Sequence, residues 1–168
     1  PYVSYSEISS CANDCQWRWK LDYLEKHRTE NFSIHFDFGH AIHEALEKHI
    51  TRHEPLTAEQ AIEHFKKSFT ELVEKNKSKY GDAKYNVDEL LKAGVNILTR
   101  LKECGELATA EVVHNEYPLW GDIEREDGLQ IKFKGFIDLV IKTKDKRGNT
   151  ILYVIDFKTC SWGWDRDT

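Results

Sequence analysis

Apolar residues recur every three or four positions through most of the first hundred residues, which is the spacing of amphipathic helices. The pattern predicts helices over residues 5–26 in two pieces, 39–50, 57–79 and 87–107. Residues 31–38 are expected to be a connector. The Thr57-Ala-Glu-Gln60 sequence fits a capping box, which predicts the start of the third helical segment. In the first segment, Trp17 and Trp19 are expected to pack in the core.

After Ala110 the pattern changes to short runs rich in β-branched and aromatic residues, which predict strands. The first run, 111–119, contains Pro118, which suggests an edge or the end of a strand. Two further runs, 131–141 and 151–159, flank a charged segment that ends in Gly148-Asn149, as in an antiparallel hairpin. Helices followed by strands predict an α+β fold, in which N-terminal helices pack on a small mixed sheet carrying this hairpin.

The register of the predicted hairpin brings two acidic residues together. A loop centred near Arg147 places Asp138 opposite Asp156, within one residue, and alternation puts Lys158 on the same face as Asp156. Opposed carboxylates about 5 Å apart repel by roughly 3 kcal/mol at an effective dielectric of about 20. A bound divalent cation would offset this repulsion. A different register would instead leave the aspartates apart in a solvated hairpin.

The composition is that of a protein without a membrane span, and 168 residues predict one domain, with a helical part at 1–108 and a sheet part at 109–160. The net charge of −5 gives no global attraction to nucleic acid, although local basic patches can restore it. Four scattered cysteines favour a reducing, cytoplasmic setting over a disulfide framework. Because residues 162–168 follow the last strand without a closing element, we expect the domain to be incomplete at its C-terminus.

Several motifs stand in a recognisable order. They are Tyr5-Ser-Glu-Ile-Ser-Ser10, Cys15-Gln-Trp-Arg-Trp19, Phe38-Gly-His-Ala-Ile-His43-Glu-Ala-Leu-Glu47, Glu116, Gly135-Phe-Ile-Asp138 and Val154-Ile-Asp156-Phe-Lys158-Thr159. This ordered set resembles the PD-(D/E)XK nuclease superfamily. The branch it resembles most is the RecB-type nuclease domain, shared with phage exonucleases and CRISPR-adaptation nucleases. The resemblance implies a restriction-endonuclease-like core.

The resemblance also implies roles for individual residues. His43, Asp138, Asp156 and the backbone carbonyl of Phe157 would hold Mg²⁺ or Mn²⁺. Lys158 would orient or activate the attacking water, and Glu116 would serve a second metal or the water. Oxygen ligands suit such cations, which lower the pKa of bound water and neutralise charge on a phosphodiester. Arg18 and Lys20 fall outside the apolar helix face and are candidate DNA-binding residues.

The sequence departs from the family pattern at two motif positions and in the cysteines that an Fe–S cluster would need. Ile137 stands where the signature has proline, and Gln16 replaces the proline after Cys15. An Fe–S cluster is possible only with cysteines outside this chain, so Cys15 is expected to be a buried thiol. The pairs Cys11/Cys15 and His49/His53 have zinc-like spacing but no clear reason to converge.

The sequence therefore predicts a metal-dependent DNA nuclease, most simply an exonuclease acting in replication, recombination or repair. The alternative is a non-catalytic nucleic-acid-binding module that retains the nuclease scaffold. Digestion polarity, strand preference and oligomeric state are not indicated by the sequence.

Overall fold

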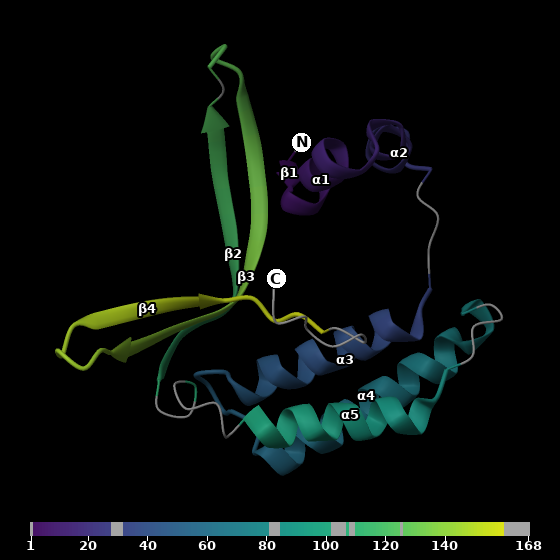
Figure 1. The fold of residues 1–168 in the computed structure, drawn as a ribbon, viewed down its shortest axis with the longest axis vertical. Helices are drawn as coiled ribbons and strands as arrows, with labels where there is room; N and C mark the ends of the chain where they lie inside the picture. Colours follow the sequence, from purple (N-terminus) through teal and green to yellow (C-terminus); the bar gives the residue numbers. More distant parts are fainter. Residues whose placement is uncertain are drawn as a thin grey trace. The chain divides into compact units, whose positions relative to one another are not determined.

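The computed structural model describes residues 2–27, 32–80, 85–101, 107, 110–124 and 126–159. The chain divides into two compact units (Figure 1). The N-terminal unit comprises Pro1–Asn31 and Glu116–Ile137, and the helical unit comprises Phe32–Asn115 and Asp138–Thr168. The cysteines at 104 and 160 and the C-terminal residues 162–168 lie outside the described residues.

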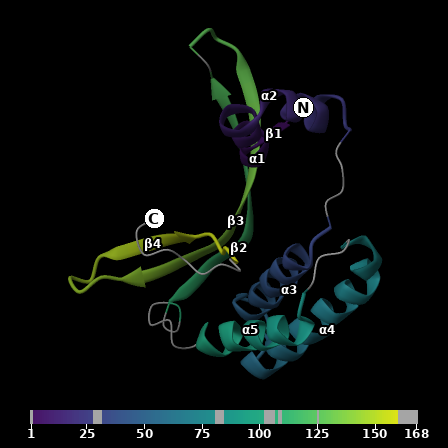
Figure 2. The ribbon, with the colours of Figure 1, turned by 45° about the vertical axis from the view of Figure 1, so that its right-hand side comes forward.

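Three helices form the core of the helical unit and lie side by side in both ribbon views (Figures 1 and 2). They are α3 (Ile34–His49), α4 (Ala58–Asn76) and α5 (Val87–Arg100), with a 3-10 turn η3 (Lys77–Lys79) after α4. Helix α4 begins with the predicted capping box, in which the side chains of Thr57 and Gln60 bond reciprocally to backbone N–H groups. The predicted extension of α5 from residue 102 to 106 lies outside the described residues.

Helix α3 begins five residues earlier than the sequence pattern predicts. The Ser33 side chain accepts a hydrogen bond from the His35 backbone N–H at 3.3 Å and so caps the helix. Ile34 and Phe38 are buried and extend its apolar face towards the N-terminus. The prediction of a connector over 31–38 was therefore wrong for most of that stretch. Its polar residues suggest a loop, whereas Ser33 caps a helix whose first turns they form.

An aromatic cluster packs the three helices together. The rings of Phe65 and Phe69 on α4 are stacked, with centroids 5.8 Å apart, and Phe38 of α3 meets both edge to face. Gly94 of α5 lies directly against this cluster, because a Cβ atom at that position would be 2.1 Å from Cζ of Phe65. The close approach of α5 to α4 thus depends on a residue without a side chain.

A buried polar network joins the start of α3 to the end of α4. Asn76, only 5% exposed, donates to Oδ2 of Asp37 at 2.9 Å, and the Tyr80 hydroxyl donates to the same oxygen. Burial, and then the bond to Asp37, raise the pKa of Tyr80 well above its ordinary value. Pairing each buried polar group in this way avoids the cost of an unsatisfied one.

The N-terminal unit opens with a strand that the sequence pattern did not predict. Strand β1 (Tyr2–Ser4) leads into four short helical pieces. These pieces are α1 (Tyr5–Ser9), the π-helical η1 (Ser10–Asp14), α2 (Gln16–Trp19) and the π-helical η2 (Lys20–Leu24). Helix α1 is capped by Ser4, whose side chain accepts from the Glu7 backbone N–H.

The expected core face of residues 15–24 is observed only in part, because Trp19, Leu21 and Tyr23 are half-buried and the other predicted members of that face are exposed. Trp17 is 66% exposed, Leu24 is also exposed, and Cys15 is exposed instead of being a buried thiol. The segment changes between α- and π-helical geometry every four or five residues, so a 3.6-residue period does not keep these side chains on one face.

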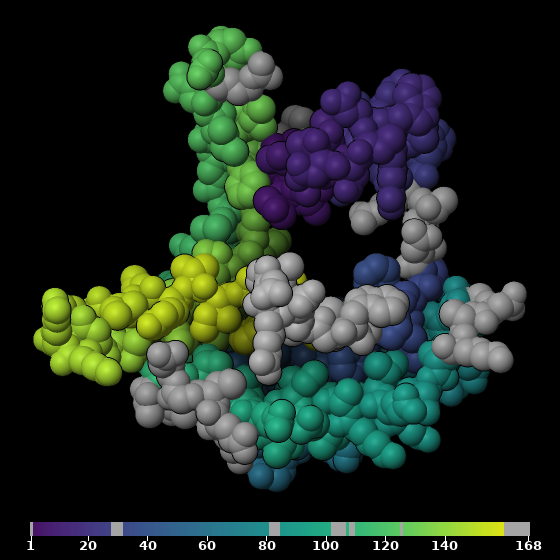
Figure 3. All heavy atoms as spheres, in the orientation of Figure 1, coloured from purple at the N-terminus to yellow at the C-terminus, as the bar shows by residue number. Residues whose placement is uncertain are grey.

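The strands form a mixed sheet, as predicted. Within the described residues its four strands run β1-β3-β2, with β4 also paired to β3. Their bounds are β2 (Glu111–Glu124), β3 (Gln130–Lys144) and β4 (Thr150–Ile155). Strand β1 is parallel to β3 and β4 is antiparallel to it. Figure 3 shows atoms of β1 against those of β3. Strand β2 continues through Pro118 and beyond the predicted end at residue 119.

Candidate active site

The hairpin of β3 and β4 has the register that the sequence predicted. Its ladder runs from Lys144↔Thr150 to Leu139↔Ile155, so one further step in the same register brings Asp138 opposite Asp156. Ladder pairing ends at that step because the Phe157 backbone N–H donates to Oδ2 of Asp138 at 2.7 Å. Asp156, Phe157 and Lys158 therefore follow the strand and do not belong to it, which differs from the predicted strand over 151–159.

Asp138 is the centre of a small group of polar contacts in the helical unit. Its side chain is 17% exposed, and its Oδ2 lies 3.9 Å from Nδ1 of His43 on α3. The ring of His43 also meets the ring of Phe157 edge to face, with centroids 6.2 Å apart. Phe157 packs against the apolar core, which fixes the chain next to Asp138.

The segment after β4 lies close to α3. A Cβ atom on Gly39, one turn before His43, would be 3.0 Å from Oγ1 of Thr159. Phe157 is near His43 and Thr159 is near Gly39, so the segment follows α3 towards its N-terminus. The missing side chain at Gly39 permits this approach.

Asp156 and Lys158 contact each other on the exposed side of this segment. Nζ of Lys158 donates to Oδ1 of Asp156 at 2.8 Å, and both side chains are 63% exposed. The two aspartates thus each have a donor, Phe157 N–H for Asp138 and Lys158 for Asp156. This arrangement relieves the carboxylate repulsion that the sequence predicted.

The donor chemistry around Asp138 fits a divalent cation in part. Two ligands that are each about 2.1 Å from one ion can be as far as about 4.2 Å apart, and the His43–Asp138 separation is within that limit. Asp156, the third predicted ligand, is bonded to Lys158 instead. Within the ranges that the structure describes, no group of three or more His, Cys, Asp or Glu side chains is close enough to hold a metal ion.

The remaining predicted residues belong to the N-terminal unit. Glu116 has a left-handed backbone with φ of 49°, which is uncommon for a residue with a side chain. Arg18 pairs with Asp22 at 3.4 Å, and Lys20 pairs with Glu25 at 3.1 Å. The roles predicted for Glu116, Arg18 and Lys20 stay predictions.

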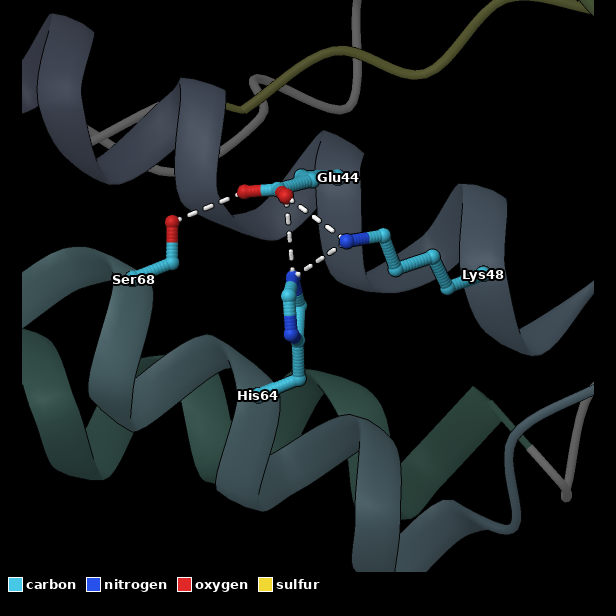
Figure 4. Close-up of polar contacts among 4 residues, drawn as sticks. All are labelled: Glu44, Lys48, His64 and Ser68. Atoms are coloured by element: carbon cyan, nitrogen blue, oxygen red, sulfur yellow. Dashed lines mark hydrogen bonds and ion pairs between the residues drawn. The ribbon is translucent and has the colours of Figure 1, made fainter.

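A second polar cluster, which sequence reasoning missed, joins α3 to α4 (Figure 4). Oε1 of Glu44 contacts Nζ of Lys48 at 2.9 Å and Nε2 of His64 at 3.0 Å, while Oε2 accepts from Ser68 at 2.8 Å. These bonds, that of Lys48 first, lower the pKa of Glu44 to about 2. Only the Lys48 contact, four residues along the same helix, has a sequence signature.

Replacing Glu44 by glutamine is expected to lower the free energy of unfolding at neutral pH by roughly 1–2 kcal/mol, allowing for partial solvent screening. Because the pKa of Glu44 is lower in the folded state, its stabilisation is complete above about pH 4.5 and is lost as the pH falls towards 2. Urea denaturation across this range should therefore show wild type and Glu44→Gln converging in acid. Glu63→Gln, at an exposed position of α4, is the control and should show no such convergence.

Comparison with known sequences identifies one family. The sequence model of the PD-(D/E)XK nuclease superfamily matches residues 2–166, nearly the whole chain. No curated protein matches the chain. Among the described helices, none is long and apolar enough to cross a membrane.

Proposed function

The chain belongs to the PD-(D/E)XK nuclease superfamily, and on this premise we propose that it is a metal-dependent deoxyribonuclease of the RecB-type branch. It hydrolyses phosphodiester bonds from DNA ends, as an exonuclease in replication, recombination or repair. The observation that carries this proposal is the grouping of His43, Asp138 and the Phe157 backbone at the end of the β3–β4 ladder.

The proposal gives each of these residues a task. His43 and Asp138, with Asp156 and the Phe157 carbonyl, would hold Mg²⁺ or Mn²⁺. The cation supplies charge neutralisation at the phosphate and a water of lowered pKa. Lys158 keeps a positive charge beside Asp156, where it can orient the attacking water or meet the scissile phosphate. Asp138 is held in place by the Phe157 N–H, so one ligand is positioned before any cation binds.

Incubation with end-labelled linear DNA and with circular DNA of the same sequence, each with Mn²⁺, tests the proposal. We expect the linear DNA to be degraded from its ends and the circular DNA to remain intact. Chelation of the cation with EDTA is expected to abolish degradation of the linear DNA. Cleavage of the circular DNA would show that the protein is an endonuclease and not an exonuclease. Absence of cleavage of both substrates would contradict the proposal.

The alternative is a non-catalytic module that binds nucleic acid on the same scaffold. It is favoured by the exposed Asp156–Lys158 pair, which leaves the third predicted ligand bonded to a lysine. Thermal unfolding during a Mn²⁺ titration separates the two cases. A nuclease site should raise the melting temperature as Mn²⁺ binds the folded state, and an inert module should not respond.

A further inference from the structure

One face of the sheet in the N-terminal unit carries exposed aromatic rings beside lysine. Tyr2 of β1 and Trp120 of β2 meet edge to face, with ring centroids 4.9 Å apart, and are 46% and 58% exposed. Nζ of Lys132 on β3 lies 5.7 Å from the centroid of the Tyr2 ring. These contacts place side chains from three strands on the same face.

Strand alternation extends this face along β3. Tyr2 is in register with Lys132, and Lys132, Lys134 and Phe136 point to the same side. Phe136 is 62% exposed, whereas Phe133, which points to the other side, is half-buried. From Lys132 to Phe136 the face extends about 13 Å along the strand. We call the set Tyr2, Trp120, Lys132, Lys134 and Phe136 the aromatic–lysine face.

We propose that the aromatic–lysine face binds single-stranded nucleic acid, with bases stacked on its rings and phosphates held by its lysines. This inference rests on the proposed function and narrows its substrate to a strand with unpaired bases. Every base has a flat π surface, and proteins that bind single strands combine aromatic side chains with positive charge. Paired bases in a duplex do not offer their faces to a side chain without unstacking.

The lysines favour this occupant over a second protein. Lysine is depleted in the cores of protein interfaces, where aromatic residues gather. Here two exposed lysines of β3 lie on the same side as the rings, and neither β1 nor the Lys132–Phe136 stretch of β3 contributes an acid. The acids that alternation brings to the face are Asp122 and Glu124 of β2, two and four residues after Trp120. They lower the positive charge and supply a test, since removing the charge of Asp122, the nearer of the two, should strengthen binding.

Binding is measured by fluorescence anisotropy with dye-labelled oligothymidylate and with a labelled DNA duplex, using full-length chain in EDTA to prevent cleavage. We expect Trp120→Ala and Phe136→Ala each to weaken oligothymidylate binding by about fivefold or more. Trp120→Phe and Phe136→Tyr keep an aromatic ring and should retain most of the affinity. Phe36→Ala removes an equally exposed ring, 68% exposed on α3, and should leave binding unchanged.

The charged positions give a second readout. Lys132→Ala and Lys134→Ala should each reduce the dependence of log Kd on log salt by about 0.7, the value for one phosphate contact on a single strand. Asp122→Asn should tighten binding.

Unchanged oligothymidylate binding in the Trp120→Ala/Phe136→Ala double variant would overturn the inference, as would an equal loss for duplex. So would a change from dimer to monomer in that variant, because it would assign the face to a second copy of the chain. The nuclease proposal fails on a different result, which is the absence of DNA cleavage by the wild-type protein. The two outcomes are independent, because an active nuclease could bind oligothymidylate without these rings, and an inactive protein could still bind it through them.

Discussion

Replacing Lys158 by alanine is expected to abolish DNA cleavage, with a loss of about 10²–10³-fold or more, while folding and DNA binding are retained. The positive charge beside Asp156 is lost, and removing one preorganised electrostatic group from an enzyme active site has an effect of this size, so the proposed site should respond in the same way. Stability should change little, because both side chains of the pair are 63% exposed and exposed ion pairs contribute roughly 0–1 kcal/mol. Release of labelled nucleotides with Mn²⁺ measures the effect.

Lys144→Ala is the matched control for this variant. Lys144 is an exposed lysine near the end of β3 in the same hairpin, so its loss changes the net charge equally without altering the Asp156 contact. Its cleavage rate should stay within a small factor of wild type. Equal activity of Lys158→Ala and Lys144→Ala would remove Lys158 from the mechanism.

Replacing Gly94 by alanine is expected to lower the free energy of unfolding by about 3 kcal/mol or more, the upper end of the cost of overpacking a core. The new Cβ would lie 2.1 Å and 2.3 Å from Cζ and Cε1 of Phe65, which is itself fully buried and stacked on Phe69. The higher helix propensity of alanine returns only about 1 kcal/mol. Chemical denaturation of the purified chain gives the difference.

Two further variants establish the cause of that loss. All three of the nearest atoms belong to the outer part of the Phe65 ring, so Phe65→Leu should recover part of the stability in the Gly94→Ala background. Gly121→Ala adds a Cβ where no atom lies within 4 Å and should be close to neutral. Additive losses in the Gly94→Ala/Phe65→Leu double variant would show that the ring is not the obstacle.

The sequence predicted the hairpin well because its signals are local. The turn-forming Gly148-Asn149 and the two flanking apolar runs locate the centre of the loop. Once that centre is known, the residue of β4 opposite each residue of β3 is fixed. The capping box at Thr57 and Gln60 is local in the same way. Membership of the nuclease superfamily was likewise predictable, because the motifs follow one another in order along the chain.

The features that the sequence did not predict depend on contacts between distant residues. Strand β1 is three residues long and exists through its pairing with Lys132–Lys134. Glu44 meets His64 and Ser68 only because α3 packs against α4. The exposure of Trp17 reflects a change of helical geometry within a few residues, which an apolar period does not reveal.

The carboxylate of Asp138 does two jobs at once, since it closes the β3–β4 ladder and faces His43. Asp138→Ala would remove the hydrogen-bond acceptor of the Phe157 N–H as well as the negative charge. A loss of activity in that variant would therefore not distinguish fraying of the hairpin from loss of the carboxylate's chemistry. Asparagine keeps an acceptor oxygen for that amide and removes the charge alone. Of the two substitutions, only Asp138→Asn separates the architecture of this hairpin from its reactivity.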